Sequence, residues 1–118
     1  MNHPQTIGVA ITLFLTTVTF AQARDAQCQI LQGEKVFYKG LCDFRADGVG
    51  GSFALLSKRR DGSLTKEVSM ISVAVSSPGV AEVRGLTRYG INSRWGEARR
   101  SAADPSCWAG ADFRICAK

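Results

Sequence analysis

The sequence predicts a small, mainly β protein: an antiparallel β-barrel or sandwich of about six or seven short strands, with at most one short helix. Three observations lead to this fold class. Short apolar segments, several of them rich in β-branched residues, alternate with polar residues. Glycine, proline, serine and aspartate separate these segments at short intervals. Four cysteines lie within 118 residues, an even number that is typical of a disulfide framework in a small exported domain.

The chain begins with a segment that is typical of a secretory signal peptide. Residues 7–20 carry no charge and are followed by Ala21-Gln22-Ala23, the small-x-small pattern of a cleavage site. We expect cleavage after Ala23, which leaves residues 24–118 as one disulfide-stabilised β domain, periplasmic or secreted. The apolar run is shorter than the roughly 20 residues of a membrane-spanning helix, so no transmembrane anchor is expected. A buried N-terminal element of a cytosolic protein is the alternative.

The single histidine, His3, lies within the predicted leader of residues 1–23. Its loss excludes Ser-His-Asp triads, Cys-His pairs and metal sites built on imidazole. Carboxylate chemistry is left, and it needs two acids that face each other about 5–10 Å apart. Most of the 10 acidic residues instead lie beside glycine, proline or basic residues, as surface carboxylates do. We therefore expect a protein that is not an enzyme and uses no metal or cofactor, with a small carboxylate-dependent glycan hydrolase as the alternative.

The cysteines predict two disulfides, and their spacing favours one pairing. They are Cys28, Cys42, Cys107 and Cys116. A turn centred on Ala111-Asp112 places Cys107 opposite Cys116 across a hairpin, at a distance that a disulfide closes with little adjustment. Cys28 then pairs with Cys42 across the turn at residues 32–34. The crossed pairing, Cys28 with Cys116 and Cys42 with Cys107, stays open, and a zinc site is a further alternative.

Between the outer cysteines the pattern is mostly that of strands. Residues 36–44 alternate in polarity, and residues 52–56 form a short apolar strand after a turn rich in glycine. The charged segment 58–62 ends in Asp-Gly, which is a strong hairpin signal, and we expect a solvated loop there. Residues 68–75 carry the longest apolar run after the leader, and their β-branched side chains favour a buried strand. Residues 80–86 form the next predicted strand.

Residues 92–101 are the one segment predicted to form a helix, because Asn92 or Ser93 is a suitable N-cap. Gly96 in its middle opposes the helix by about 1 kcal/mol relative to alanine. A connector then leads into the final hairpin at residues 107–116, which completes the predicted domain.

Arginine and tryptophan gather toward the end of the chain, and we predict a binding face there. The planar guanidinium group recognises carboxylates and phosphates, and both residue types often dominate binding hot spots. The predicted contact residues are Arg94, Trp95, Arg99, Arg100 and Trp108. The expected partner is a protein or an anionic envelope polymer. The alternative, in which the tryptophans belong to the core and the arginines to a solvated rim, stays open.

The formal net charge of +5 is also compatible with nucleic-acid binding. Basicity alone is weak evidence for that partner, and export removes the protein from intracellular nucleic acid. We therefore expect no nucleic-acid partner, and the sequence does not determine the oligomeric state.

Two segments resemble a group of small exported alphaproteobacterial proteins of unassigned function. These are residues 92–98 (NSRWGEA) and 104–117 (DPSCWAGADFRICA). In size, export, disulfides and barrel character the chain also loosely resembles periplasmic lysozyme inhibitors. That resemblance implies a loop of serine and glycine that enters the lysozyme cleft, and Gly50-Gly51-Ser52 is the nearest string. A charge of +5 opposes this alternative, because common lysozymes are themselves basic. The leading hypothesis is an exported, non-catalytic binding or inhibitor protein.

Overall fold

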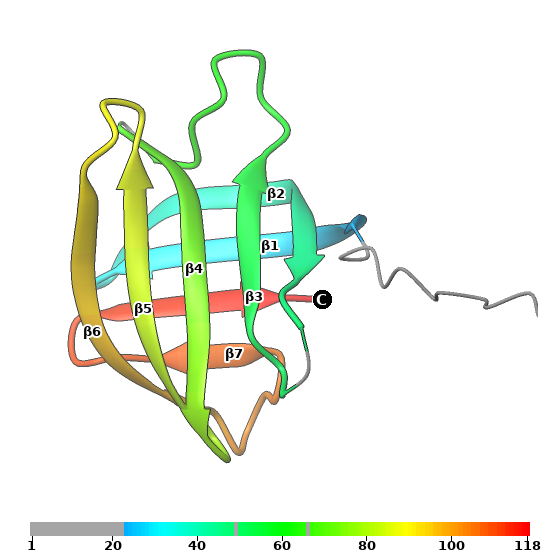
Figure 1. Ribbon diagram of the computed structural model, residues 1–118, viewed down its shortest axis with the longest axis vertical. Helices are drawn as coiled ribbons and strands as arrows, with labels where there is room; N and C mark the ends of the chain where they lie inside the picture. Colours follow the sequence, from blue (N-terminus) through cyan, green and yellow to red (C-terminus); the bar gives the residue numbers. More distant parts are fainter. Residues whose placement is uncertain (1–22, 49, 66) are drawn as a thin grey trace, which may run out of the picture.

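The computed structural model describes residues 23–48, 50–65 and 67–118, in which eight strands form a closed antiparallel barrel (Figure 1). The strands are β1 (Ala23–Gln32), β2 (Lys35–Ala46), β3 (Phe53–Ser57), β4 (Val68–Ser77), β5 (Val80–Thr87), β6 (Asn92–Arg100), β7 (Cys107–Ala109) and β8 (Phe113–Ala117). Each strand pairs with the next along the chain, and β1 pairs with β8 to close the sheet. The predicted mainly β fold is therefore confirmed, as a barrel. The predicted leader lies outside the described residues, except for Ala23.

The helix predicted for residues 92–101 is wrong, and this segment supplies the strand that the sequence count lacks. Residues Asn92–Arg100 form β6, which pairs with β5 on one side and with β7 on the other. The β5–β6 register shifts between Val83 and Arg84, which leaves Trp95 as an extra residue in a bulge. Gly96 follows it with a φ of 119°, a value that glycine adopts readily and a helix does not use. Pairing on both sides outweighs the helix propensity of the segment.

Alternating apolar side chains from all eight strands fill the barrel interior. Ile30, Leu55, Ile71, Val83 and Ile115 are fully buried, and each comes from a different strand. The alternation has the two-residue period of a strand, which directs every second side chain inward. Leu64, in the loop between β3 and β4, is also fully buried and covers one end of the barrel.

Both favoured disulfides are formed, Cys28–Cys42 and Cys107–Cys116, so the crossed pairing is excluded. Cys107 lies directly opposite Cys116 in the β7–β8 register, as the predicted turn requires. Cys28 lies opposite Gly40 rather than Cys42, and its Cα atom is 5.8 Å from that of Cys42 along the diagonal. Two disulfides fit an oxidising, extracytoplasmic compartment. Within the described ranges, no helix is long and apolar enough to cross a membrane.

Candidate binding site at the mouth of the barrel

The predicted contact residues do not form one continuous face. Arg94 and Arg99 lie on the outer surface of β6, and each has a carboxylate of the chain itself beside it. Arg94 Nε is 2.9 Å from Glu82 Oε1, and an Arg99 nitrogen is 3.4 Å from Glu97 Oε1. Arg84 lies 3.0 Å from the same Glu82 oxygen, so that Glu82 is shared between two arginines. These exposed pairs add little to stability, but they partly compensate the charge of Arg94 and Arg99. Arg94 and Arg99 therefore already have anionic partners within the chain.

The two tryptophans pack on the core. Trp108 is 5% exposed and belongs to the buried cluster. Trp95 is half-buried, and its ring meets the edge of Phe113 with centroids 5.7 Å apart. Gly85 leaves room for it, since a Cβ atom there would lie 2.8 Å from Trp95 Nε1. Neither ring therefore stands free on the surface as a flat contact face would require.

Arg100 and Trp108 instead take part in a hollow at the end of the barrel opposite Leu64, which we call the mouth. The hollow has a volume of about 730 Å³. Residues from seven strands and from the β4–β5 turn line it, because the strand ends converge there. Its apolar lining, which we call the floor, includes Phe44, Phe53, Val75, Trp108 and Ala117. The size falls in the range of sites that hold small ligands.

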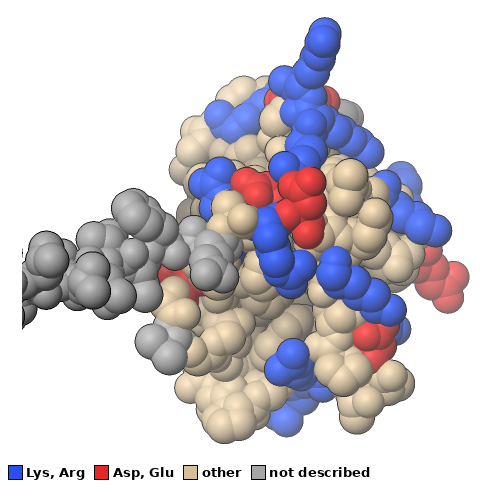
Figure 2. Space-filling view, turned by 90° about the vertical axis from the view of Figure 1, so that its right-hand side faces the viewer, with Lys and Arg blue, Asp and Glu red and all other residues tan. Residues whose placement is uncertain are grey.

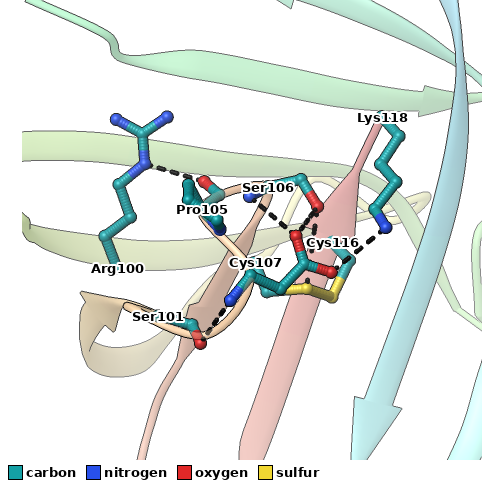
Figure 3. The surroundings of a disulfide bond; sticks show 8 residues. Arg100, Ser101, Pro105, Ser106, Cys107, Cys116 and Lys118 are labelled. Atoms are coloured by element: carbon teal, nitrogen blue, oxygen red, sulfur yellow. Dashed lines mark hydrogen bonds and ion pairs between the residues drawn. A yellow bond between two sulfur atoms is a disulfide. The ribbon is translucent and has the colours of Figure 1, made fainter.

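Two arginines lie at this mouth, and each is held over an aromatic ring. The Arg24 guanidinium carbon is 4.4 Å from the centre of the Phe44 ring, which is itself stacked on Phe53 at 4.9 Å. Arg100 is paired with Trp108 across β6 and β7, and its guanidinium carbon is 5.8 Å from that ring. Arg100 Nε also donates to the Pro105 carbonyl oxygen at 2.7 Å (Figure 3). Cation–π contacts and this hydrogen bond restrict where both guanidinium groups can point.

Among the residues that the structure describes, no acidic residue lines the mouth or forms an ion pair with its two arginines, Arg24 and Arg100. This covers every Asp and Glu of the sequence, because all of them lie in the described ranges. In Figure 2 the acidic side chains on one side of the molecule form small groups with basic side chains beside them, while other basic side chains lie well apart. The mouth is thus a concave, cationic site with an apolar floor.

The chain matches no model of a known protein family, no curated protein and no solved structure. The resemblance of its tail to small exported proteins stays an expectation. The assignment of the mouth as a binding site therefore rests on its geometry alone. Arg24 is the residue that sequence reasoning missed, because it lies at the far end of the domain from Arg100. Nothing in its local pattern sets it apart, and only the pairing of β1 with β2 and β8 brings it to the mouth.

The connection between β6 and β7 positions the Arg100 side of the mouth. The Asp104 carboxylate accepts hydrogen bonds from the Ser106 hydroxyl at 2.6 Å and from the Ser106 backbone N–H at 3.2 Å. Lys118 Nζ lies 3.2 Å from the same carboxylate. Figure 3 shows this network beside the Cys107–Cys116 disulfide and next to the Arg100–Pro105 contact. The network holds Pro105 where its carbonyl oxygen meets Arg100.

We predict that Asp104→Asn destabilises the fold near neutral pH and not in acid. The Ser106 hydroxyl, together with Lys118, lowers the pKa of Asp104 below its ordinary value of 3.8. A lowered pKa in the folded state stabilises the fold above the ordinary value, and this contribution is lost as the pH falls through the folded-state pKa. Urea unfolding followed by circular dichroism at about pH 6 and about pH 2 measures the difference.

The matched control is Asp112→Asn, an exposed aspartate in the β7–β8 turn. We expect the unfolding midpoint of this control to stay near that of the natural protein at about pH 6. An Asp104→Asn deficit of the same size at both pH values would contradict the role given to the ionised carboxylate.

Proposed function

We propose that the protein is an exported, non-catalytic binding protein, periplasmic or secreted, that holds an anionic group of its ligand at the mouth. One observation carries this proposal. Arg24 and Arg100 flank a concave hollow and have no ion-pair partner among the described residues. A guanidinium group binds a carboxylate or phosphate with two parallel hydrogen bonds. Rings that already restrict both guanidinium groups lower the entropy lost on binding.

The mouth replaces the outer face of β6 as the favoured contact surface. Of the residues predicted from the sequence, Arg100 and Trp108 belong to it, whereas Arg94 and Arg99 form ion pairs with Glu82 and Glu97. A hollow of about 730 Å³ suits a single molecule or a chain end better than the broad surface of a protein. We therefore favour an anionic envelope component over a protein partner.

The hydrolase alternative finds no supporting geometry at the mouth. Two pairs of carboxylates do lie opposite each other in the sheet, Asp25 with Asp43 and Glu82 with Glu97. Each pair has basic side chains beside it. Lys58 Nζ is 2.6 Å from Asp25 and Arg45 is 3.1 Å from Asp43, while Glu82 and Glu97 form the arginine pairs described above. Neither pair lines the described hollow. Paired acids on an outer face do not enclose a glycosidic bond as such catalysis requires.

The inhibitor alternative likewise gains no specific observation. Gly50 and Gly51 do line the mouth, but the Ser52 hydroxyl accepts a hydrogen bond from the Val75 backbone N–H at 2.9 Å. That serine therefore takes part in the fold.

Binding of two anionic probes tests the proposal. Polygalacturonate represents an acidic envelope polymer, and decyl phosphate, kept below its micelle concentration, represents an anion with an apolar part. We expect the natural protein to bind at least one of them by calorimetry. Arg24→Gln with Arg100→Gln is expected to weaken that binding by at least about tenfold, because each charged hydrogen bond contributes about 1.5–3 kcal/mol.

The matched control is Arg94→Gln with Arg99→Gln, which removes the same charge from the outer face of β6. It is expected to leave the affinity within about twofold, because these arginines already face Glu82 and Glu97. Absence of binding to both probes would overturn the proposal. Equal weakening by the two variant pairs would also overturn it, since net charge and not the mouth would then be responsible.

A further inference from the structure

We infer that the ligand of the mouth is an amphipathic anion, whose carboxylate or phosphate meets Arg24 and Arg100 and whose apolar part lies on the floor. This inference rests on the proposed function and adds the chemical class of the ligand. It depends on three features of the hollow: its apolar floor, the prior use of its hydroxyl groups, and the covered faces of its rings.

The floor of the hollow is apolar. Phe53 and Trp108 are 7% and 5% exposed, while Phe44, Val75 and Ala117 are half-buried and pack against the core. All of them line the hollow. A hydrocarbon or aryl group placed there removes further apolar surface from water, which is favourable in proportion to the area.

Two of the three serines that line the hollow use their hydroxyl groups within the chain itself. Among the serines that line it, the Ser76 hydroxyl donates to the Val80 carbonyl oxygen at 3.4 Å, and the Ser106 hydroxyl donates to Asp104 at 2.6 Å. A sugar polymer carries many hydroxyl groups that need hydrogen-bond partners once they are buried. Apart from Ser77 and the two arginines, the side chains of the hollow offer few such partners, which favours a ligand with a single polar group over a glycan.

The aromatic rings also lack open faces on which a sugar or a base could stack. One face of Phe44 is covered by Phe53 and the other by the Arg24 guanidinium. Trp108 is almost fully buried, and Arg100 lies over its ring. The rings therefore hold the arginines and supply apolar contact. This combination suits a charged head joined to an apolar tail, taken up as a single molecule.

A series of alkyl phosphates of increasing length, all kept as monomers, tests the inference on the natural protein by calorimetry. Because burial of a methylene group is worth about 0.8 kcal/mol, the affinity is expected to rise about three- to fourfold for each methylene that enters the hollow. Methyl phosphate gives the contribution of the head group, and decanol gives that of the tail. Both are expected to bind far more weakly than decyl phosphate.

Two variants test whether the apolar tail of the ligand lies in the hollow. Val75→Phe fills part of the hollow. It is expected to weaken the binding of decyl phosphate by at least about fivefold and to leave the binding of methyl phosphate unchanged. Val36→Phe adds the same volume at an exposed position of β2 outside the hollow, and is expected to change the affinity for neither phosphate. Circular dichroism confirms that both variants fold. If Val75→Phe does not fold, the chain-length series on the natural protein still decides the question.

The outcomes separate this inference from the proposed function. Affinity that is independent of chain length, or polygalacturonate binding through Arg24 and Arg100 that exceeds that of decyl phosphate, would overturn the amphipathic ligand and leave the anion-binding mouth in place. Absence of binding to every anion would overturn both. Co-sedimentation with phosphatidylglycerol vesicles distinguishes a bilayer from a single molecule: sedimentation that requires both arginines would overturn uptake of a single molecule.

Discussion

Trp108→Ala is expected to lower the free energy of unfolding by about 3–5 kcal/mol, the loss typical of a large aromatic residue removed from a core. Trp108 is 5% exposed and lies opposite Ile115, which is fully buried. Its removal leaves a cavity between the short strand β7 and the rest of the barrel, and it takes away the ring beneath Arg100. Urea unfolding followed by far-ultraviolet circular dichroism measures the loss.

Trp95→Ala is the variant for comparison, because Trp95 is only half-buried and folding removes less of its surface from water. We expect a clearly smaller loss for it than for Trp108→Ala. Trp108→Phe keeps a ring at the same place, and is expected to fall between the natural protein and the alanine variant. A cost below about 1 kcal/mol for Trp108→Ala would identify Trp108 as a surface residue instead.

Removal of the Cys107–Cys116 disulfide, by alanine at both positions, is expected to cost about 2–4 kcal/mol. The bridge joins residues nine apart in sequence and closes the hairpin of β7 and β8. β7 has only three residues and pairs with β6 at Arg99 and Arg100 alone, so few hydrogen bonds hold it otherwise. Because Trp108 and Pro105 flank this bridge in the chain, we also expect weaker binding of anions at the mouth.

The Cys28→Ala, Cys42→Ala variant is the matched control. Its bridge joins residues 14 apart, so the expected loss of stability is of similar size. Long paired strands, β1 and β2, hold these positions in place without the bridge. None of the four cysteines, all of which the structure describes, lines the mouth. Ser106, Trp108 and Ala117, which do line it, adjoin Cys107 and Cys116 in the chain, whereas no lining residue adjoins Cys28 or Cys42. The affinity for decyl phosphate should therefore stay close to that of the natural protein. Equal loss of affinity in both double variants would show that the hairpin bridge has no particular role at the mouth.

Features that depend on neighbouring residues could be predicted from the sequence. The hairpin at residues 107–116 was predicted with its register and its disulfide, because a turn between two close cysteines leaves few arrangements. Alternation predicted strands in the regions of β2 to β5, because apolar side chains at every second position have only one face to bury.

The β6 segment shows where local pattern fails. Glu97, Ala98 and Arg99 favour a helix by intrinsic propensity, but the segment lies between β5 and β7 and satisfies its backbone groups on both sides. The bulge at Trp95 and Gly96 reconciles its side chains with the pleat. Partners that are distant in the sequence decide this strand, so its own residues do not reveal it.

Composition and spacing alone determined that this is a small β protein with two disulfides, because alternation and the cysteine hairpin are local constraints. Tertiary structure decided which arginines remain free for a ligand. Arg94 and Arg99 looked equivalent to Arg100 along the chain, yet strand pairing places Glu82 and Glu97 beside the first two. Barrel closure brings Arg24 to the mouth with Arg100. Ion pairing and concavity are properties of positions in space, and adjacent residues in the sequence do not specify them.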